Sequence, residues 1–266
     1  MFLDGGRVSL SKDISLILSG WAYDPEDLEV RIVAGDDGRD KIQMRVDLGL
    51  IQMETSGRPD GSRPEGHESL LEFYETGAMK GAGSSDSFVL DPKACMALMR
   101  EGLQYYHRYL AAFHLERYDL VVRDTERNLR LFAFAVKHAA RPQDKMQFDQ
   151  YRPYVVMMRS RALAHQARDH RDFKTALAVI DHGIESIRQY LNDYNRSDEE
   201  ATFPELNSLL RLRREVESER PVGPVERLEQ QLAKAVEREK YEEAARLRDQ
   251  LIRLKGEEVT TRPPTS

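Results

Sequence analysis

Apolar residues recur at a helical period through the middle of the chain, from residue 91 to about 195. This 3.6-residue period predicts four helices, at about 91–116, 118–139, 143–168 and 172–194. Each helical pair turns at a similar sequence, and the aromatic residues that follow the two turns, Tyr118 and Phe173, lie 55 positions apart. That offset suits a repeat of helical hairpins. Pro153 predicts either a kink in the third helix or its true start.

A fifth amphipathic helix is predicted over residues 204–219, where leucines follow the same period. Pro221 and Pro224 bracket Gly223 directly after it, and this combination stops a helix. We therefore expect a hinge between the helical region and the end of the chain.

Before residue 90 the period changes to two. Val30 and Ile32 alternate with polar residues, a turn-forming stretch follows at residues 35–38, and a second alternation carries Ile42, Met44, Val46 and Leu48. Two such runs around an Asp-Gly turn predict a β-hairpin.

Residues 57–66 include three glycines and two prolines, which excludes a helix or a central strand there. Arg58 and Arg63 each precede a proline, so a stiff backbone holds both side chains. Two interpretations stay open: a structured turn, or a binding loop that presents Arg58 and Arg63 to an acidic group. A second loop is expected at residues 77–87.

Two short apolar seams mark the end of the chain. Val225, Leu228, Leu232 and Ala235 are spaced 3, 4, 3, and Ala244, Leu247, Leu251 and Leu254 repeat that spacing. Two seams of equal length predict an antiparallel helical hairpin with coiled-coil packing over residues 224–255. Pro224 suits the first helical position.

The same segment resembles the UvrB/UvrC (UVR) motif. Its most recognisable stretch, Tyr-Glu-x-Ala-Ala-x-Leu-Arg-Asp, is present at residues 241–249 in Tyr241, Glu242, Ala244, Ala245, Leu247, Arg248 and Asp249. Further matches are Leu228, Leu232, Ala235, Glu239 and Leu254, whereas Leu251 stands where the family usually has isoleucine. The resemblance implies a docking site in which one hairpin packs on another, and it assigns all of these residues to partner binding.

A second resemblance covers residues 161–184, which are similar to a tetratricopeptide (TPR) unit. The residues at that family's packing positions are Leu163, Ala164, Ala176, Ile180 and Gly183. Any packed pair of helices needs small residues where the backbones approach, so a true solenoid and a generic helical bundle both stay open. The first 90 residues resemble bacterial proteins known only as UvrB/UvrC-motif-containing, which implies no mechanism.

The charge balance argues against direct binding to nucleic acid. The chain has 40 basic and 46 acidic side chains, a net charge of -6. The predicted hairpin carries eight basic and seven acidic residues between positions 225 and 255. Strong phosphate binding needs clustered, unopposed basic charge. No apolar run is long enough to span a membrane, and no secretion signal is evident, so we expect a cytoplasmic protein.

No residue set nominates a reaction. Cys95 is the only cysteine, which excludes a disulfide framework within the chain and a four-thiolate zinc site. His107 and His114 are seven residues apart, whereas metal ligands on one helix are normally three or four apart. We expect no catalytic residue, no cofactor and no metal, although an unrecognised active site in residues 1–90 stays open. An aromatic stripe is either core packing or the lining of a peptide groove: Tyr105, Tyr106, Tyr109 and Phe113.

These patterns predict a mainly α protein in four parts: a small α+β segment at 1–90, a helical bundle or TPR-like domain at 91–220, the UVR hairpin at 224–255 and a disordered tail at 256–266. We expect an adaptor that docks another protein, either one with a UVR hairpin or a second copy of this chain. Two alternatives stay open. One is an accessory factor of nucleotide excision repair; the other is a zinc-less relative of the activators of protein-arginine kinases, whose zinc-binding cysteine pairs this chain lacks.

Overall fold

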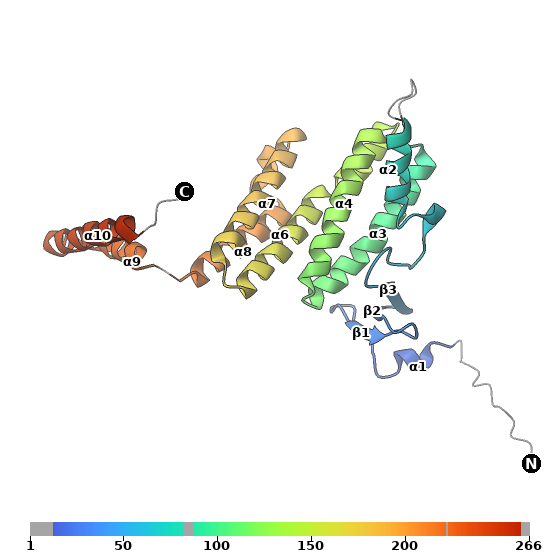
Figure 1. Ribbon diagram of the computed structural model, residues 1–266, viewed down its shortest axis with the longest axis horizontal. Coiled ribbons are helices and arrows are strands. Elements are labelled where there is room, and N and C mark those ends of the chain that lie inside the picture. Colours follow the sequence, from blue (N-terminus) through green and yellow to red (C-terminus); the bar gives the residue numbers. More distant parts are fainter. Residues whose placement is uncertain (1–12, 82–87, 222, 262–266) are drawn as a thin grey trace, which may run out of the picture. The chain divides into compact units, whose positions relative to one another are not determined.

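The computed structural model describes residues 13–81, 88–221 and 223–261. The chain divides into two compact units, Met1–Val216 and Glu217–Ser266. The first unit contains a small sheet and most of the helices, and the second contains a pair of helices (Figure 1). The predicted fold class is confirmed: a mainly α protein with N-terminal strands and a C-terminal helical hairpin.

The strands are β1 (Val30–Ala34), β2 (Asp40–Val46) and β3 (Gly49–Glu54). The α-helices that begin in the first unit are α1 (Ser15–Leu18), α2 (Leu70–Gly81), α3 (Pro92–His114), α4 (Tyr118–His138), α5 (Pro142–Asp149), α6 (Arg152–Asp169), α7 (Phe173–Asp193) and α8 (Pro204–Glu219). The second unit holds α9 (Pro224–Glu237) and α10 (Tyr241–Thr261). Short 3-10 helices lie at Pro64–Gly66 and Ser197–Thr202.

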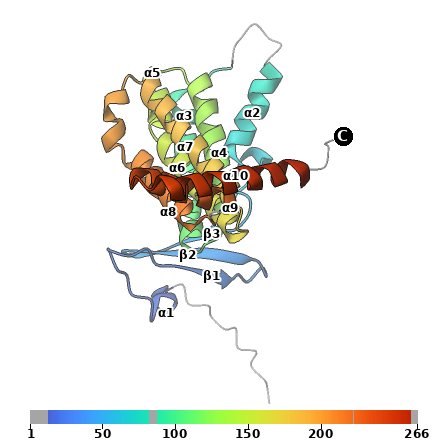
Figure 2. The same ribbon diagram turned by 90° about the vertical axis from the view of Figure 1, so that its left-hand side faces the viewer.

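The three strands form an antiparallel meander at one end of α3 and α4 (Figures 1 and 2). Ile32 pairs with Ile42 across β1 and β2, which confirms the predicted hairpin. The sequence did not indicate β3. Val46 pairs with Gly49, so the chain reverses at Asp47 and Leu48, and Leu48 is 92% exposed. The second strand of the predicted hairpin therefore ends at Val46, and Leu48 lies in the turn that follows it.

Three boundaries differ from those predicted. The third predicted helix is two helices, α5 and α6, and Pro153 lies in the first turn of α6, which makes it a start and not a kink. Residues 77–81 of the second predicted loop belong to α2, and residues 82–87 lie outside the described part. Finally, α10 continues to Thr261, six residues into the predicted disordered tail, because no helix-breaking proline occurs before position 263.

Three helical hairpins close with the same local turn. A residue with positive φ follows each first helix: Glu116 (56°), Arg171 (56°) and Glu239 (57°). The next residue donates its N–H to the carbonyl of an alanine five positions earlier, at Ala112, Ala167 or Ala235. This is the Schellman arrangement, which satisfies the last carbonyl groups of a helix. The turn reverses the direction of the chain, so that the next helix runs antiparallel to the first.

A buried ion pair fixes the sheet on α3 and α4. Arg108 donates to both carboxylate oxygens of Asp124, at 2.6 and 2.9 Å, and both side chains are 1% exposed. Arg108 also donates to the carbonyl of Glu54 at 2.8 Å, and Arg123 donates to that of Thr55 at 2.9 Å. The end of β3 is thereby held through its main chain.

Glu101 performs a similar task for α2. Its fully buried carboxylate accepts hydrogen bonds from the backbone N–H groups of Leu70 (2.7 Å) and Leu71 (3.2 Å), at the start of that helix. It also pairs with Arg127 and Arg58. A carboxylate suits this position because the first N–H groups of a helix lack partners within it.

Candidate interaction site

The hairpin of α9 and α10 has clear start and turn signals. Pro224 lies in the first turn of α9, where its missing N–H costs nothing, and Gly223 occupies the capping position. Glu239 adopts φ of 57° and closes the Schellman turn, and α10 starts two residues later at Tyr241. The predicted two-helix hairpin is confirmed.

The seam of this hairpin lies where the spacing predicts it. Ala235 and Ala244 are the most buried, at 4% and 8% exposure, on either side of the turn. The other seam side chains are partly buried: Val225, Leu228, Leu232, Leu247, Leu251 and Leu254. Small residues next to the turn let the two backbones approach, and leucines fill the wider space beyond it. The seam therefore holds the two helices together.

A second stripe of residues occupies the outer side of α10. Tyr241, Ala245, Arg248 and Ile252 are spaced 4, 3, 4, which places them on one side of the helix and away from the seam. All four are exposed, Tyr241 to 69% and Ile252 to 62%. We call these four residues the outer face. It combines uncovered apolar area with one guanidinium group.

The charges around the outer face have both signs. Arg248 pairs with Asp249 at 3.1 Å, and Lys240 pairs with Glu243 at 3.3 Å near the turn. All four side chains are more than half exposed, so these pairs contribute little to stability. The mixture favours contact with a protein surface of matching charges over contact with a phosphate backbone.

Comparison with known protein families agrees with this geometry. The family model of the UvrB/uvrC motif matches residues 224–257. This hairpin is a UVR motif. Neither the curated proteins nor the solved structures provide a match to the chain. The resemblance inferred from the sequence is thus confirmed over α9 and most of α10.

The residues of the UVR motif divide into two groups in space. The seam contains Leu228, Leu232, Ala235, Ala244, Leu247, Leu251 and Leu254, which face the opposite helix. The exposed group contains Glu239, Tyr241, Glu242, Ala245, Arg248 and Asp249. A partner can contact the second group directly, whereas the first acts on a partner only by maintaining the hairpin. The spacing predicted the seam group, because its members recur at intervals of three and four residues on each helix.

In the α3–α4 hairpin, the face that corresponds to the outer face is covered by another helix. Its turn carries Glu116, an arginine and Tyr118 where the UVR hairpin has Glu239, a lysine and Tyr241. The ring of Tyr118 stacks on His165 of α6, with centroids 4.8 Å apart. The α4 residues that correspond to the rest of the outer face are partly or fully buried: Val122, Thr125 and Leu129. In the UVR hairpin the same positions are exposed.

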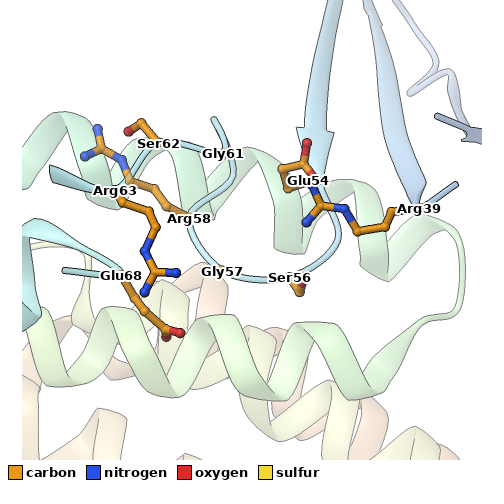
Figure 3. A pocket seen from close by; sticks show the side chains of 9 residues that line it. All are labelled: Arg39, Glu54, Ser56, Gly57, Arg58, Gly61, Ser62, Arg63 and Glu68. Carbon is orange, nitrogen blue, oxygen red and sulfur yellow. The ribbon is translucent and has the colours of Figure 1, made fainter. Parts of the chain in front are cut away.

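Arg58 and Arg63 line one cleft of about 280 Å³ at the end of the sheet (Figure 3). Arg58 is only 13% exposed and pairs with Asp60 at 3.1 Å and Glu101 at 3.4 Å. It serves to pin the loop on α3. Arg63 is exposed, and among the described residues it has no carboxylate within ion-pair distance. A structured turn therefore accounts for Arg58, and only Arg63 is free to contact a ligand.

The remaining charges of this cleft are largely paired within the protein. Glu54 pairs with Lys41 at 2.6 Å, and Arg39 pairs with Asp37 at 2.7 Å. Hydrogen bonds from Lys41 and Arg39 hold the pKa of Asp37 below its usual range. Figure 3 shows Arg63 and Glu68 on one side of the cleft and Arg39 and Glu54 on the other. The cleft thus has no uniform field that would attract an anion.

The aromatic stripe of α3 is divided between core and groove. Tyr105 and Tyr109 are buried, and Phe113 packs edge-on against Tyr118. Tyr106 and the buried Tyr109 also line an apolar groove, together with Tyr154. The stripe therefore contributes to the core and borders a groove, and peptide binding in that groove stays a prediction.

The remaining residues considered in the sequence have structural positions. Cys95 is buried, and burial raises the pKa of its thiol, which disfavours the reactive thiolate. Ala164, Ala176 and Ile180 are fully buried, and Gly183 lies against Ser160, as the close packing of any pair of helices requires. Within the described ranges, no three His, Cys, Asp or Glu side chains gather as a metal site. No helix there is long and apolar enough to cross a bilayer.

Proposed function

We propose that the chain is an interaction adaptor that docks a partner protein through the outer face of its UVR hairpin. One observation carries the proposal: Tyr241 is 69% exposed, whereas Tyr118, at the matching position of the α3–α4 hairpin, is covered by α6. The partner supplies the helix that α6 supplies within the first unit. Family membership of residues 224–257 supports the same conclusion.

The chemistry of the outer face defines its partner. Tyr241 and Ile252 require an apolar stripe about 16 Å long, since they are eleven residues apart on a helix. Arg248 and Asp249 require charges of opposite sign beside that stripe. A helix from a second UVR-type hairpin meets both requirements. An interface limited to one stripe of a single helix is smaller than most stable protein–protein interfaces, which suits a transient complex.

Co-precipitation tests this proposal. The bait is the tagged intact chain, beside a chain that ends at Arg220 and the variants Tyr241→Asp and Ile252→Asp. We expect the intact chain to retain a partner that the other three lose. Gln231→Asp, at an exposed position of α9, is the matched control and should retain it. A partner that still binds the chain ending at Arg220 would place the docking site elsewhere.

The family match also supports a second candidate, an accessory role in nucleotide excision repair. In that case the partner is a protein of the UvrB or UvrC type. The adaptor and repair candidates share the docking mode and differ in the partner that is recovered. Nuclease treatment of the extract should not release the partner in either case, because the hairpin has eight basic and seven acidic residues between positions 225 and 255. Titration with duplex DNA near physiological salt should give negligible binding.

A further inference from the structure

A second apolar stripe runs along α3, in the first unit. Met96, Met99, Leu103 and Tyr106 are spaced 3, 4, 3, so they share one side of the helix. Met96 is 57% exposed and Leu103 is 51% exposed, while Met99 and Tyr106 are partly buried. A helix in a soluble protein normally packs such a stripe against another element. The described residues leave this one largely open.

Three residues of the stripe, Met99, Leu103 and Tyr106, form one wall of a groove of about 600 Å³. Tyr151 and Tyr154, at the junction of α5 and α6, also line it, with contributions from the buried Tyr109, Phe132 and Val155. The rings of Tyr106 and Tyr154 lie 6.1 Å apart, and Tyr151 is 50% exposed. Burial raises the pKa of Tyr154 to about 12, so its hydroxyl stays neutral. The lining is apolar with a few hydroxyl groups, as in other sites for peptides and small molecules.

Two charged side chains complete the lining. Arg100 of α3 and Glu205 at the start of α8 both contribute to the groove. Arg100 contacts the sulfur of Met96, and neither Arg100 nor Glu205 forms an ion pair with another described residue. Because Arg100 and Glu205 border the same apolar groove, a ligand with charges of both signs would complement it best.

The walls indicate the conformation of that occupant. The stripe and the tyrosines belong to helices and their junction, and the backbone groups of a helix bond within the helix. An extended segment would find no sheet edge here to pair with its own N–H and C=O groups. A helical segment satisfies these groups internally. Its apolar side chains at 3, 4, 3 spacing would match the stripe, which is about 15 Å long.

We propose that this groove binds an amphipathic helix of a partner protein, which places apolar side chains on Leu103 and Tyr151, an acidic side chain near Arg100 and a basic one near Glu205. The proposal goes beyond the docking function of the UVR hairpin. It gives the first unit a site of its own, so that the chain connects two proteins.

Three labelled peptides serve as probes in fluorescence anisotropy with the intact chain. Each has about 16 residues and the same leucine stripe; one carries Glu at one end and Lys at the other, one carries Glu at both ends, and one Lys at both ends. We expect the mixed peptide to bind most tightly. Leu103→Glu should weaken it by about tenfold or more, because it places a charge in the apolar contact. Leu48→Glu, a matched change at a 92% exposed leucine of the sheet, should leave binding unchanged.

Charge reversal gives the sharper test. Arg100→Glu should shift the preference to the peptide with two lysines, and Glu205→Arg should shift it to the peptide with two glutamates, each by about threefold or more. Circular dichroism checks that each variant is folded. An unchanged order of affinities in both variants would overturn the proposal.

Two further measurements separate the alternatives. Sedimentation of a dimer that Leu103→Glu converts to a monomer would identify the groove as a contact between two copies, and would also overturn the proposal. Leu247→Asp, in the seam of the UVR hairpin, should leave peptide binding unchanged. Failure of this groove and failure of the UVR docking site are thereby distinguishable.

Discussion

The α3–α4 and α9–α10 hairpins turn in the same way and differ in what lies between their helices. Val121, Asp124, Asn128 and Leu131 of α4 occupy the positions that Ala244, Leu247, Leu251 and Leu254 occupy in α10. In α4 two of the four are polar: Asp124 binds Arg108, and Asn128 donates to the carbonyl of Gly102 at 3.0 Å. In α10 all four are aliphatic.

The difference reflects how much of its stability each hairpin must obtain from its own seam. The α3–α4 pair packs against α2, α5, α6 and the sheet, so its own seam is only one of several contacts that stabilise it. Buried polar partners can then fix its position without loss of the fold. The α9–α10 pair makes up most of the second unit, so its seam must supply most of the stability of that unit. A buried charge in this seam would lower that stability. The same turn thus closes two seams of different chemistry.

The largest expected effect is at the buried ion pair. Asp124→Asn leaves the guanidinium of Arg108 buried beside a neutral amide, which should lower the free energy of unfolding of the first unit by about 3–5 kcal/mol. Urea denaturation followed by circular dichroism measures it. Asp249→Asn, at the exposed ion pair of the UVR hairpin, is the counterpart and should cause no measurable change. A loss of less than about 1 kcal/mol in Asp124→Asn would contradict the contrast between the two seams.

The next largest effect is in the aliphatic seam. Leu247→Asp places a carboxylate between α9 and α10, at a cost of about 2–3 kcal/mol, which a 34-residue hairpin cannot absorb. Helicity should fall by about the content of α9 and α10, and partner binding should be lost. The melting temperature of the first unit should stay the same. A single lowered transition for the whole chain would show that the two units unfold together.

The two matching tyrosines give a smaller and more specific difference. Tyr118→Ala removes the stack on His165 and should destabilise the first unit by about 2 kcal/mol. Tyr241→Ala removes an exposed ring and should leave the free protein as stable as before, while it weakens partner binding. Thermal unfolding of both variants, with and without the partner, tests the pair. Equal destabilisation of the free protein would mean that Tyr241 is covered within the chain.

The smallest effect concerns the turns themselves. Glu116→Gly and Glu239→Gly each place glycine at a residue with positive φ, which should stabilise the local hairpin by about 0.5–1 kcal/mol. Hydrogen exchange of the amides in the last turn of α3 and α9 is sensitive enough to measure it. If Glu239→Gly stabilises the hairpin but weakens partner binding, the Glu239 side chain contacts the partner.

The sequence predicted those parts of the fold that depend on local spacing. The start of α8, the β1–β2 hairpin and the seam of α9 and α10 follow from period and turn residues alone. It could not predict β3, because its short apolar run directly continues that of β2, with only Asp47 and Leu48 between them. The break between α5 and α6 was reduced to two possibilities by Pro153 and needed the structure for a decision.

The candidate sites show the same limit. The spacing of the UVR motif placed its seam correctly, since a hairpin satisfies most of its contacts within 34 residues. Glu101, Arg108 and Asp124 gave no such signal, because charged residues on a helix usually face solvent and their partners are up to 54 positions away. The groove beside Leu103 was only partly indicated by the sequence. Tyr106 and Tyr109 belong to the aromatic stripe that suggested either a core or a groove, whereas Met99 and Leu103 resemble an ordinary core face.

The hydrogen bonds from Arg108 and Arg123 to the end of β3 affect how the sequence of this region can evolve. Both guanidinium groups hold main-chain carbonyl oxygens, of Glu54 and Thr55, which every amino acid provides. Substitutions at the positions they hold therefore leave these anchors in place. The loop that begins there can exchange its exposed side chains, Arg63 among them, and acquire new specificity without a new scaffold.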